Sequence, residues 1–446
     1  MTVGAFFKNT GHHIASWRHP RAQPDAGVNI EHYISSAQLA EQACFDFLFF
    51  ADSVAIRDGP LENLSRQAQF TAYFEPTTLL AALATQTSKI GLVATMSTSY
   101  NDPYSVARRA ASIDHLSHGR AGWNAVTSVL QGEARNFGRD EHFEKQERYE
   151  RAAEFIEVVR GLWDSWDDDA FTYDRQRGRF FDPDRVHRLD HVGEHFKVAG
   201  PLNVPRCPQG HPVVFQAGSS ETGRELAAAS ADGIFCAELD MDRAVDFCAD
   251  LGNRLVAHGR TRDSVRILPG FTAVVGATEA EAKERAAELA ALIQPEAGKY
   301  YLTQITGVDL QDVDPDDPFP DPTGVEKTGG IPENVRQMAR TEGLTVRQLY
   351  ERLAGSHGKL TMVGSASQIA DEMQRWYDAA ACDGFIITPS TMPGEFEDVV
   401  ELLVPELKDR GLMRADYDGE TLREHLGLAR PTSRYSTATT SPETHP

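Results

Sequence analysis

Cysteine is scarce in this sequence. The five cysteines, Cys44, Cys207, Cys236, Cys248 and Cys382, are scattered, and no two of them form a CxxC pair. The spacing indicates neither a disulfide framework nor a zinc ribbon. We therefore expect five reduced thiols.

Long hydrophobic runs are also missing. No stretch of about 18 apolar residues occurs, so the sequence contains no candidate transmembrane helix. Residues 1–7 (MTVGAFF) have neither the basic region nor the apolar stretch of a signal peptide. These absences predict a cytoplasmic protein that does not enter a membrane.

Basic residues are few relative to acidic ones. The chain of 446 residues has 44 Lys and Arg against 66 Asp and Glu, and its formal net charge is −22. This charge repels phosphate backbones and anionic lipid surfaces, which argues against nucleic acid as a partner. The 41% hydrophobic and 25% charged residues are near the globular average, so the chain can bury a large core.

The histidine clusters lack the features of a metal site. Residues 11–19 (GHHIASWRH) contain three histidines but no carboxylate at ligand spacing. The three histidines of residues 187–195 are four apart, but Gly193 interrupts any helix there and no HExxH motif occurs. We expect no catalytic metal.

What the sequence does contain is a regular alternation of short apolar runs and amphipathic stretches, which is typical of repeated βα units on a parallel sheet. Eight strands are predicted, at residues 4–7, 47–51, 90–95, 121–126, 213–216, 233–236, 267–275 and 384–388. Apolar spacings of three and four predict helices at residues 36–44, 77–85, 103–116, 148–166, 221–231, 241–258, 279–293 and 367–381. Eight such units favour an α/β fold of the (βα)8 TIM-barrel class.

Three segments do not fit the repeat. Residues 167–212 are rich in charge and are interpreted as an excursion at the barrel rim, and residues 294–362 as a larger insertion. Within the insertion, residues 309–321 (DLQDVDPDDPFPD) combine proline with like charge, which opposes regular structure and makes this loop a candidate mobile lid. We expect residues 1–430 to form one domain and residues 431–446 a flexible tail.

Polar, mostly uncharged residues follow several of the predicted strands, where a barrel of this class places its working groups. Asp52, Thr98 and Asn124 stand at the ends of strands two, three and four. After strand five, Gly218 allows close approach of the backbone, and Ser219 or Ser220 can cap a helix whose N-terminus favours phosphate. This lining suits a planar heterocycle with polar edges, carried by a mononucleotide. An ordinary helix cap is the alternative interpretation of the serines.

Several segments in the same half of the chain resemble the nitrilotriacetate monooxygenase and dibenzothiophene-sulfone monooxygenase group of bacterial luciferase-like flavin monooxygenases. The resemblance rests on residues 97–104 (STSYNDPY), 114–117 (DHLS), 119–124 (GRAGWN), 136–138 (NFG), 147–149 (ERY), 200–202 (GPL) and 216–220 (QAGSS). It covers most of residues 1–240.

The resemblance implies FMN contacts, with Tyr149, Ser219 and Ser220 toward the phosphate and Asp52 and Thr98 nearer the ring. The group often has a histidine four residues before this tyrosine, where this sequence has Lys145, and whether Lys145 replaces it is open.

Two further assignments follow from the position of the strands. Asn124 would bring an amide, which both donates and accepts, to the flavin edge where oxygen reacts, and we predict a catalytic role for it. His12 and His13 follow strand one and are similar to the group's substrate-side loop.

The resemblance implies a two-component monooxygenase that uses FMNH2 and O2 to oxidise a small organic substrate such as an amine or a sulfur compound. No GxGxxG motif follows a strand, so a separate NAD(P)H-dependent flavin reductase is expected to supply FMNH2. We also expect a homo-oligomer. The alternatives are a deazaflavin-dependent oxidoreductase on the same barrel and a non-catalytic flavin-binding protein.

Overall fold

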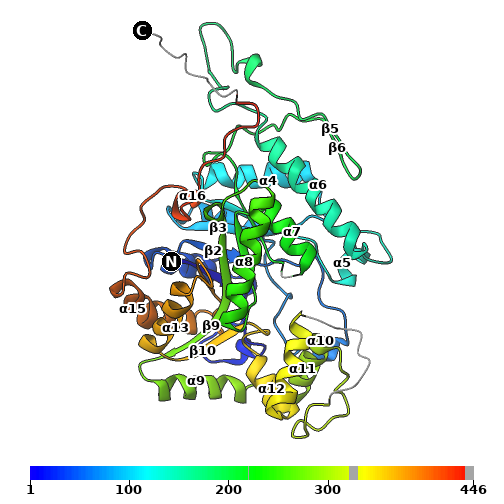
Figure 1. The fold of residues 1–446 in the computed structure, drawn as a ribbon, viewed down its shortest axis with the longest axis vertical. Coiled ribbons are helices and arrows are strands. Elements are labelled where there is room, and N and C mark those ends of the chain that lie inside the picture. Colours follow the sequence, from blue (N-terminus) through cyan, green and yellow to red (C-terminus); the bar gives the residue numbers. More distant parts are fainter. Residues whose placement is uncertain (219, 321–329, 437–446) are drawn as a thin grey trace.

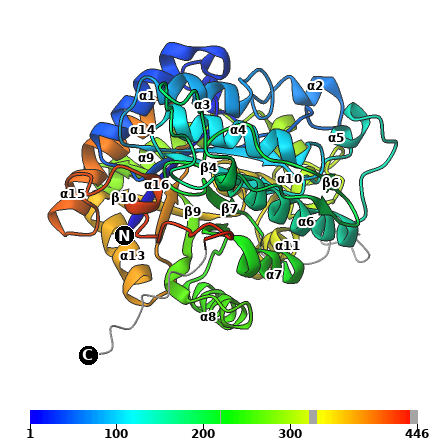
Figure 2. The same cartoon turned by 90° about the horizontal axis from the view of Figure 1, so that it is seen from above.

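Eight parallel strands close into a barrel that is surrounded by helices (Figures 1 and 2). The computed structural model describes residues 1–218, 220–320 and 330–436. The barrel strands are β1 (Thr2–Phe7), β2 (Phe47–Phe50), β3 (Gly91–Ser97), β4 (Ala121–Val126), β7 (Val213–Gln216), β8 (Gly233–Cys236), β9 (Arg266–Gly276) and β11 (Gly384–Ile387). Because β9 pairs with both β8 and β11, and β11 pairs with β1, the eight strands form a closed barrel. The predicted (βα)8 fold and its eight strands are confirmed.

The predicted helices are present, with their ends shifted by a few residues. They are α1 (Ile30–Gln42), α3 (Pro76–Ala84), α4 (Pro103–Leu116), α6 (Lys145–Trp163), α7 (Glu221–Ser230), α8 (Met241–Ala257), α9 (Glu279–Ala291) and α13 (Ala366–Asp378). Helix α1 begins six residues before the predicted start because the side chain of Asn29 caps it, accepting the backbone N–H of His32 at 3.1 Å. None of the helices in the described part of the chain has both the length and the apolar character needed to cross a membrane.

Shorter helices occupy the connections. They are α2 (Leu61–Leu64), α5 (Gln131–Asn136), α14 (Gly394–Asp398), α15 (Val404–Asp409) and α16 (Leu422–His425). Helix α16 is the most consequential of them, because its Leu422 and the following Leu426 pack into the interior of the barrel.

A ninth strand of the same sheet lies outside the barrel and was not predicted. The first four residues of β9 pair with β8, and residues 271–276 of β9 pair instead with β10 (Leu360–Ser365). Strand β9 therefore leaves the barrel halfway along its length. Strand β10 (LTMVGS) was not predicted because its apolar residues are interrupted by Thr361 and followed by Gly364 and Ser365. In the structure only two of its six residues are buried.

The insertion at residues 294–362 contains three helices that the sequence did not predict: α10 (Pro295–Thr306), α11 (Gly330–Glu342) and α12 (Val346–Leu353). Figure 1 shows them grouped beside the barrel. Tyr301, Leu349 and Leu353 belong to a hydrophobic cluster of their own, which also takes in Ile14 from the barrel side. Of the predicted irregular segment, residues 309–320 form no helix or strand, and residue 321 lies outside the described residues.

The excursion at residues 167–212 contains a single 3-10 turn at Pro183–Arg185 and a short hairpin of β5 (His191–Val192) and β6 (Lys197–Val198). The start of the C-terminal tail packs against it. The ring of Tyr435 stacks on His187 with 4.2 Å between centroids, and Arg206 donates a hydrogen bond to the Pro431 carbonyl at 2.8 Å. The first residues of the tail thus have defined contacts with the excursion. Residues 437–446 lie outside the described part.

Large apolar side chains fill the barrel interior. Phe6, Phe47, Phe49, Phe215 and Leu268 are all less than 9% exposed and belong to one cluster. A filled interior leaves no room for a ligand inside the barrel, so a binding site must lie at its rim.

A buried arginine ties the amino ends of β3 and β4 to the preceding helices. The Arg120 guanidinium donates hydrogen bonds to the carbonyls of Ser117, Ile90, Ala84 and Thr87 and to the Thr87 hydroxyl, at 2.6 to 3.2 Å. Arg120 is 1% exposed, so these carbonyls have no access to water as an alternative donor.

We predict that Arg120→Met lowers the free energy of unfolding by about 3 kcal/mol, because it leaves several buried carbonyls without a donor. Urea unfolding followed by circular dichroism measures the change. The control is Arg108→Met. Arg108 is exposed on α4, the helix that ends just before Ser117, and its substitution should change the free energy of unfolding by less than about 0.5 kcal/mol. Equal midpoints for the two variants would contradict the role of Arg120.

Candidate functional site

A cleft of about 370 Å³ opens at the carboxyl ends of β2, β4 and β7. The segments that follow these three strands supply most of its wall, and the first turns of α6 and α7 close one end. Its lining includes Asp52, Ser53, Arg57, Phe70, Ser128, Glu133, Tyr149, Gln216, Gly218, Gly223 and Leu226. The cleft therefore lies at the edge of the barrel where the sequence placed the site.

One end of the cleft has the features of an anion site. Ser220 is the N-cap of α7, and its hydroxyl accepts the Gly223 N–H at 3.3 Å. The Tyr149 hydroxyl lies 3.5 Å from the Ser220 hydroxyl. A Cβ at Gly218 would lie 3.0 Å from the Cα of Gly223, so only glycine permits this approach of the two chain segments. A helix N-terminus, two hydroxyls and an open backbone together suit a phosphate group.

Lys145 and His142 lie near this end but outside the lining. Lys145 is exposed at the first position of α6, one turn before Tyr149. The ring of His142 packs against Tyr100, with 5.2 Å between centroids, and both of its ring nitrogens are buried without a partner in the described structure. The predicted Ser219 contact falls on a residue outside the described part.

A buried carboxylate joins two walls of the cleft. Glu133, which is 4% exposed, accepts hydrogen bonds from the Ser53 hydroxyl and the Val54 N–H on the β2 side. Its other oxygen accepts the N–H groups of Val129 and Leu130 on the β4 side, at 3.3 and 3.0 Å. Together with the bonds from Gly132, Arg135 and Asn136 to the same β2-side segment, this carboxylate fixes the separation of the two walls.

Asp52 lies at the wall of the cleft, and the pKa of its carboxyl is raised. Burial, with a smaller contribution from the nearby Glu75 carboxylate, raises the pKa of its carboxyl from 3.8 to about 6. The Tyr73 hydroxyl, 3.3 Å away, acts in the opposite direction by donating a hydrogen bond. The carboxyl is thus an acceptor above about pH 6 and gains a proton below it.

Asn124 and Thr98 do not line the cleft. Asn124 points into the barrel, is 4% exposed and donates from Nδ2 to the Thr95 hydroxyl at 2.9 Å. Its Oδ1 is buried and has no hydrogen-bond partner in the described structure. Thr98 is 1% exposed, and its hydroxyl and N–H both donate to the Val126 carbonyl, which makes it a link between β3 and β4.

The two histidines assigned to the substrate side have different surroundings. His12 is fully buried, with Nε2 3.0 Å from the Phe6 carbonyl and Nδ1 without a partner in the described part of the chain. His13 faces a different cavity of about 440 Å³, which lies toward β10 and is also lined by Thr272 and Lys359. His12 and His13 are thus adjacent in the sequence but face different parts of the structure.

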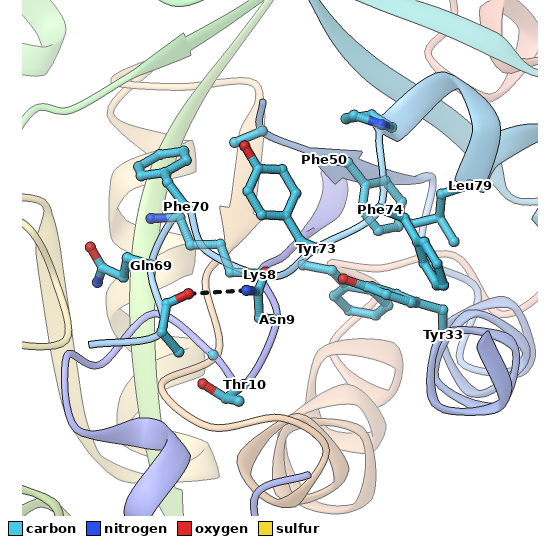
Figure 3. Close-up of a pocket in the computed structure, with 15 residues that line it drawn as sticks. Lys8, Asn9, Thr10, Tyr33, Phe50, Gln69, Phe70, Tyr73, Phe74 and Leu79 are labelled. Atoms are coloured by element: carbon cyan, nitrogen blue, oxygen red, sulfur yellow. Dashed lines mark hydrogen bonds between the residues drawn. The ribbon is translucent and has the colours of Figure 1, made fainter. Parts of the chain in front are cut away.

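A third cavity is too small for a cofactor. It lies under residues 68–74, between Lys8, Tyr33 and Phe50, and has a volume of about 30 Å³ (Figure 3). A space of this size holds about one water molecule.

Several residues of the site escaped the sequence analysis. Ser53 directly follows Asp52, and Lys8 directly follows strand one, so the rule that finds Asp52 could have found both. Glu133 and Phe70 carry no such signal, because neither directly follows a strand: Glu133 lies in the short helix α5 and Phe70 in a loop.

The donor set fits a flavin mononucleotide. The phosphate end combines the close approach of Gly218 and Gly223 with the Ser220 and Tyr149 hydroxyls, and the Asp52 carboxylate at the β2 wall is an acceptor for a ring N–H. Metal binding has no comparable support, since no group of three or more His, Cys, Asp or Glu side chains in the described structure is arranged to hold an ion.

The chain is similar to known proteins in family, sequence and structure. A family model described as luciferase-like monooxygenase matches residues 10–383. The chain is 44% identical to N-acetyl-S-(2-succino)cysteine monooxygenase of Bacillus subtilis (strain 168) over 98% of both chains. It is also 44% identical to nitrilotriacetate monooxygenase component A of Aminobacter aminovorans, over 97% of both chains. The crystal structure of riboflavin lyase with modified FMN and riboflavin is 34% identical, has a TM-score of 0.82 and is covered to 96%, as is this chain.

We predict that Glu133→Ala loosens the cleft without unfolding the barrel. Four donors lose their acceptor, which should cost about 1 to 3 kcal/mol. Hydrogen exchange measured by mass spectrometry should become faster in the peptides that contain residues 53–54 and 129–130. The exposed Glu141→Ala should leave both peptides unchanged, and unchanged exchange in Glu133→Ala would show that the cleft does not depend on this carboxylate.

Proposed function

The chain belongs to the luciferase-like monooxygenase family, and from that membership we propose that it is the oxygenase component of a two-component system. In this proposal it uses FMNH2 and O2 to oxidise a small organic molecule that contains an amine or a sulfur atom. A separate NAD(P)H-dependent flavin reductase delivers the FMNH2.

The observation that carries the proposal is the polarity of the cleft along its length. The Ser220 and Tyr149 hydroxyls and the α7 N-terminus stand at one end, and the polar Asp52 and Ser53 lie at the β2 wall. A mononucleotide has the same order of groups, a phosphate at one end and a polar-edged ring at the other.

Each residue has a defined task in this arrangement. The Ser220 hydroxyl can donate to the phosphate while its lone pair keeps the Gly223 N–H, and the Tyr149 hydroxyl donates beside it. The Asp52 carboxylate accepts from a ring N–H, and Asn124, which is buried behind the β4 wall, has no direct contact with the ring in this arrangement. When bound, the reduced flavin supplies the electrons that activate O2, which no side chain of the chain can do.

A separate reductase is supported by what the chain and its relative contain. No GxGxxG motif follows any strand of this sequence, so no segment resembles an NADH site. The nitrilotriacetate enzyme is named as component A, which implies a further component.

The decisive experiment is incorporation of 18O. We expect the purified protein, supplied with FMN, NADH and a generic flavin reductase under 18O2, to give a product one 18O atom heavier from at least one amine or thioether of a substrate panel. Mass spectrometry detects the product. Tight binding of a deazaflavin, together with no O2 consumption when FMNH2 is supplied, would overturn the proposal. Stoichiometric flavin binding without any product would indicate a flavin carrier instead.

Ser220→Ala should weaken FMN binding by about 1 to 3 kcal/mol, the range for the loss of a hydrogen bond to a charged group. Riboflavin, which has no phosphate, should bind wild type and variant equally. Fluorescence titration with both ligands tests the assignment. An equal loss for riboflavin would show that the serine acts only as a helix cap, and unchanged FMN affinity would move the phosphate elsewhere.

Asp52 should make ring binding dependent on pH. With a pKa of about 6, its carboxyl is ionised and accepts a hydrogen bond at pH 7.5, and it becomes protonated as the pH falls through 6. Riboflavin affinity should therefore drop on acidification, by at most about tenfold per pH unit below 6. Riboflavin is the ligand of choice because the FMN phosphate itself titrates near pH 6. Asp52→Asn should show a flat profile, and parallel profiles for the two proteins would exclude Asp52 as the titrating group.

A further inference from the structure

Two lysines stand above an aromatic floor at the mouth of the barrel. The floor consists of Phe6, Phe49 and Phe235, whose ring centroids lie 5.1 to 5.9 Å apart. Lys8 directly follows β1, and its Nζ lies 5.8 Å from the Phe6 centroid. Lys359 directly precedes β10 and reaches in over Gly270, where an added Cβ would lie 2.6 Å from the Phe235 ring and 3.1 Å from the Lys359 Cδ.

Arg57 joins the lysines through a shared aromatic ring. The Lys8 ammonium lies 5.2 Å and the Arg57 guanidinium 5.4 Å from the centroid of Phe70. Figure 3 shows the Lys8 side chain extended toward this ring. Phe70 has a φ of +54°, in the left-handed region that bulky side chains rarely adopt. The backbone is thus strained at the residue that holds two cations, as is common at functional sites.

The cationic cluster, defined as Lys8, Arg57 and Lys359, has no acidic partner. In the described part of the chain, none of these three side chains forms an ion pair or a hydrogen bond. Asp58, the acidic neighbour of Arg57 in sequence, pairs with Arg135 and accepts the Gly132 N–H. Other buried cations of the molecule are satisfied, as Arg423 is by Asp232 at 2.8 Å.

Burial makes these unpaired charges costly. It lowers the pKa of Lys8 well below its usual value, and the nearby Lys359 and Arg57 lower it further. The pKa of Lys359 falls to about 8, again through burial. The cation–π contacts offset only part of this cost. An arrangement that destabilises the empty protein is expected where a ligand of opposite charge completes it.

Two buried histidines border the cluster without adding charge. Burial, together with Lys8 and Lys359, lowers the pKa values of His12 and His357 well below the usual range, so both are neutral. The Nε2 of His357 lies 2.7 Å from the His12 carbonyl, and its Nδ1 lies 3.2 Å from the Tyr301 hydroxyl. The Asp52 carboxylate in the neighbouring cleft is engaged by Tyr73.

We propose that Lys8, Arg57 and Lys359 form an anion subsite that binds a carboxylate group of the organic substrate. The inference rests on the proposed function and extends it, because it names the chemical class of the substrate. The cofactor phosphate has its own site at Ser220 and Tyr149, and Arg57 and Phe70 line the same cleft as these two segments. Lys8 lines the small cavity under residues 68–74 and Lys359 the cavity of His13, so the three cations stand between neighbouring cavities and away from Ser220 and Tyr149. A carboxylate bound there would not compete for the phosphate.

The test uses nitrilotriacetate as the probe and its neutral triamide as the control ligand, each titrated by calorimetry into the full-length protein with and without FMN. We expect wild type to bind the acid and not the triamide. Lys8→Met and Lys359→Met should each weaken binding of the acid at least tenfold. Lys89→Met, a surface lysine paired with Glu420, should have no effect.

Thermal unfolding provides a second measurement. Because methionine removes an unpaired buried charge and keeps the length of the side chain, Lys8→Met should unfold at a higher temperature than wild type when no ligand is present. The acid should then raise the unfolding temperature of wild type only. A lower unfolding temperature for ligand-free Lys8→Met would show that the lysine is structural and would overturn the proposal.

The remaining outcomes are also distinct. Equal binding of acid and triamide, or no binding of the acid by wild type, would overturn the anion subsite. Loss of affinity for FMNH2 in the lysine variants, measured under anaerobic conditions, would assign the cluster to the reduced ring instead of the substrate. Failure of wild type to bind FMN, with charge-selective binding of the acid intact, would contradict the proposed function and leave the subsite standing.

Discussion

The packed interior of the barrel is the constraint from which the rest of the structure follows. Phenylalanines from β1, β2 and β7 meet in the barrel interior, and Leu422 and Leu426 of the C-terminal segment belong to the same hydrophobic cluster. No ligand can enter a core of this kind, so every polar group with a chemical task must stand where the strands end. The cleft, the helix cap at Ser220 and the cationic cluster all obey this rule, although they come from segments far apart in the chain.

The treatment of buried charge distinguishes structural from functional positions. Arg120 is surrounded by carbonyls, and Arg423 is paired with Asp232, so the cost of burying each guanidinium is met within the protein. At the rim, Lys8 and Lys359 have only aromatic rings beside them. The chain carries 66 acidic residues, so carboxylates that could pair with lysines are plentiful in it. The absence of one in the described structure separates them from the arginines of the scaffold.

The sequence was informative where a pattern is local. Short apolar runs that alternate with amphipathic stretches located all eight barrel strands, and reading the residues that follow them led to Asp52 and to the Ser220 cap. It was less informative where the signal depends on a distant partner. Thr98 follows a strand as Asp52 does, yet its hydroxyl is used by the Val126 carbonyl, which only the pairing of β3 with β4 reveals. Lys359 lies before a strand that has little hydrophobic character, and its approach to Phe235 depends on a glycine 89 residues earlier in the chain.

The two ends of the site are built from different parts of the chain. Tyr149, Gly218 and Ser220 come from the units around β4 and β7 and form the end assigned to the cofactor. Lys8 comes from β1, and Lys359, His357 and Tyr301 come from the insertion at residues 294–362, which also contacts the Arg57 segment through the hydrogen bond from Tyr300 to Asp58 at 2.9 Å. Because the insertion packs on its own hydrophobic cluster, its residues can change with little effect on the cofactor end. The insertion supplies Lys359 to the cationic cluster, whereas Lys8 and Arg57 come from segments that follow β1 and β2, so this end of the site is built jointly by the barrel and its insertion.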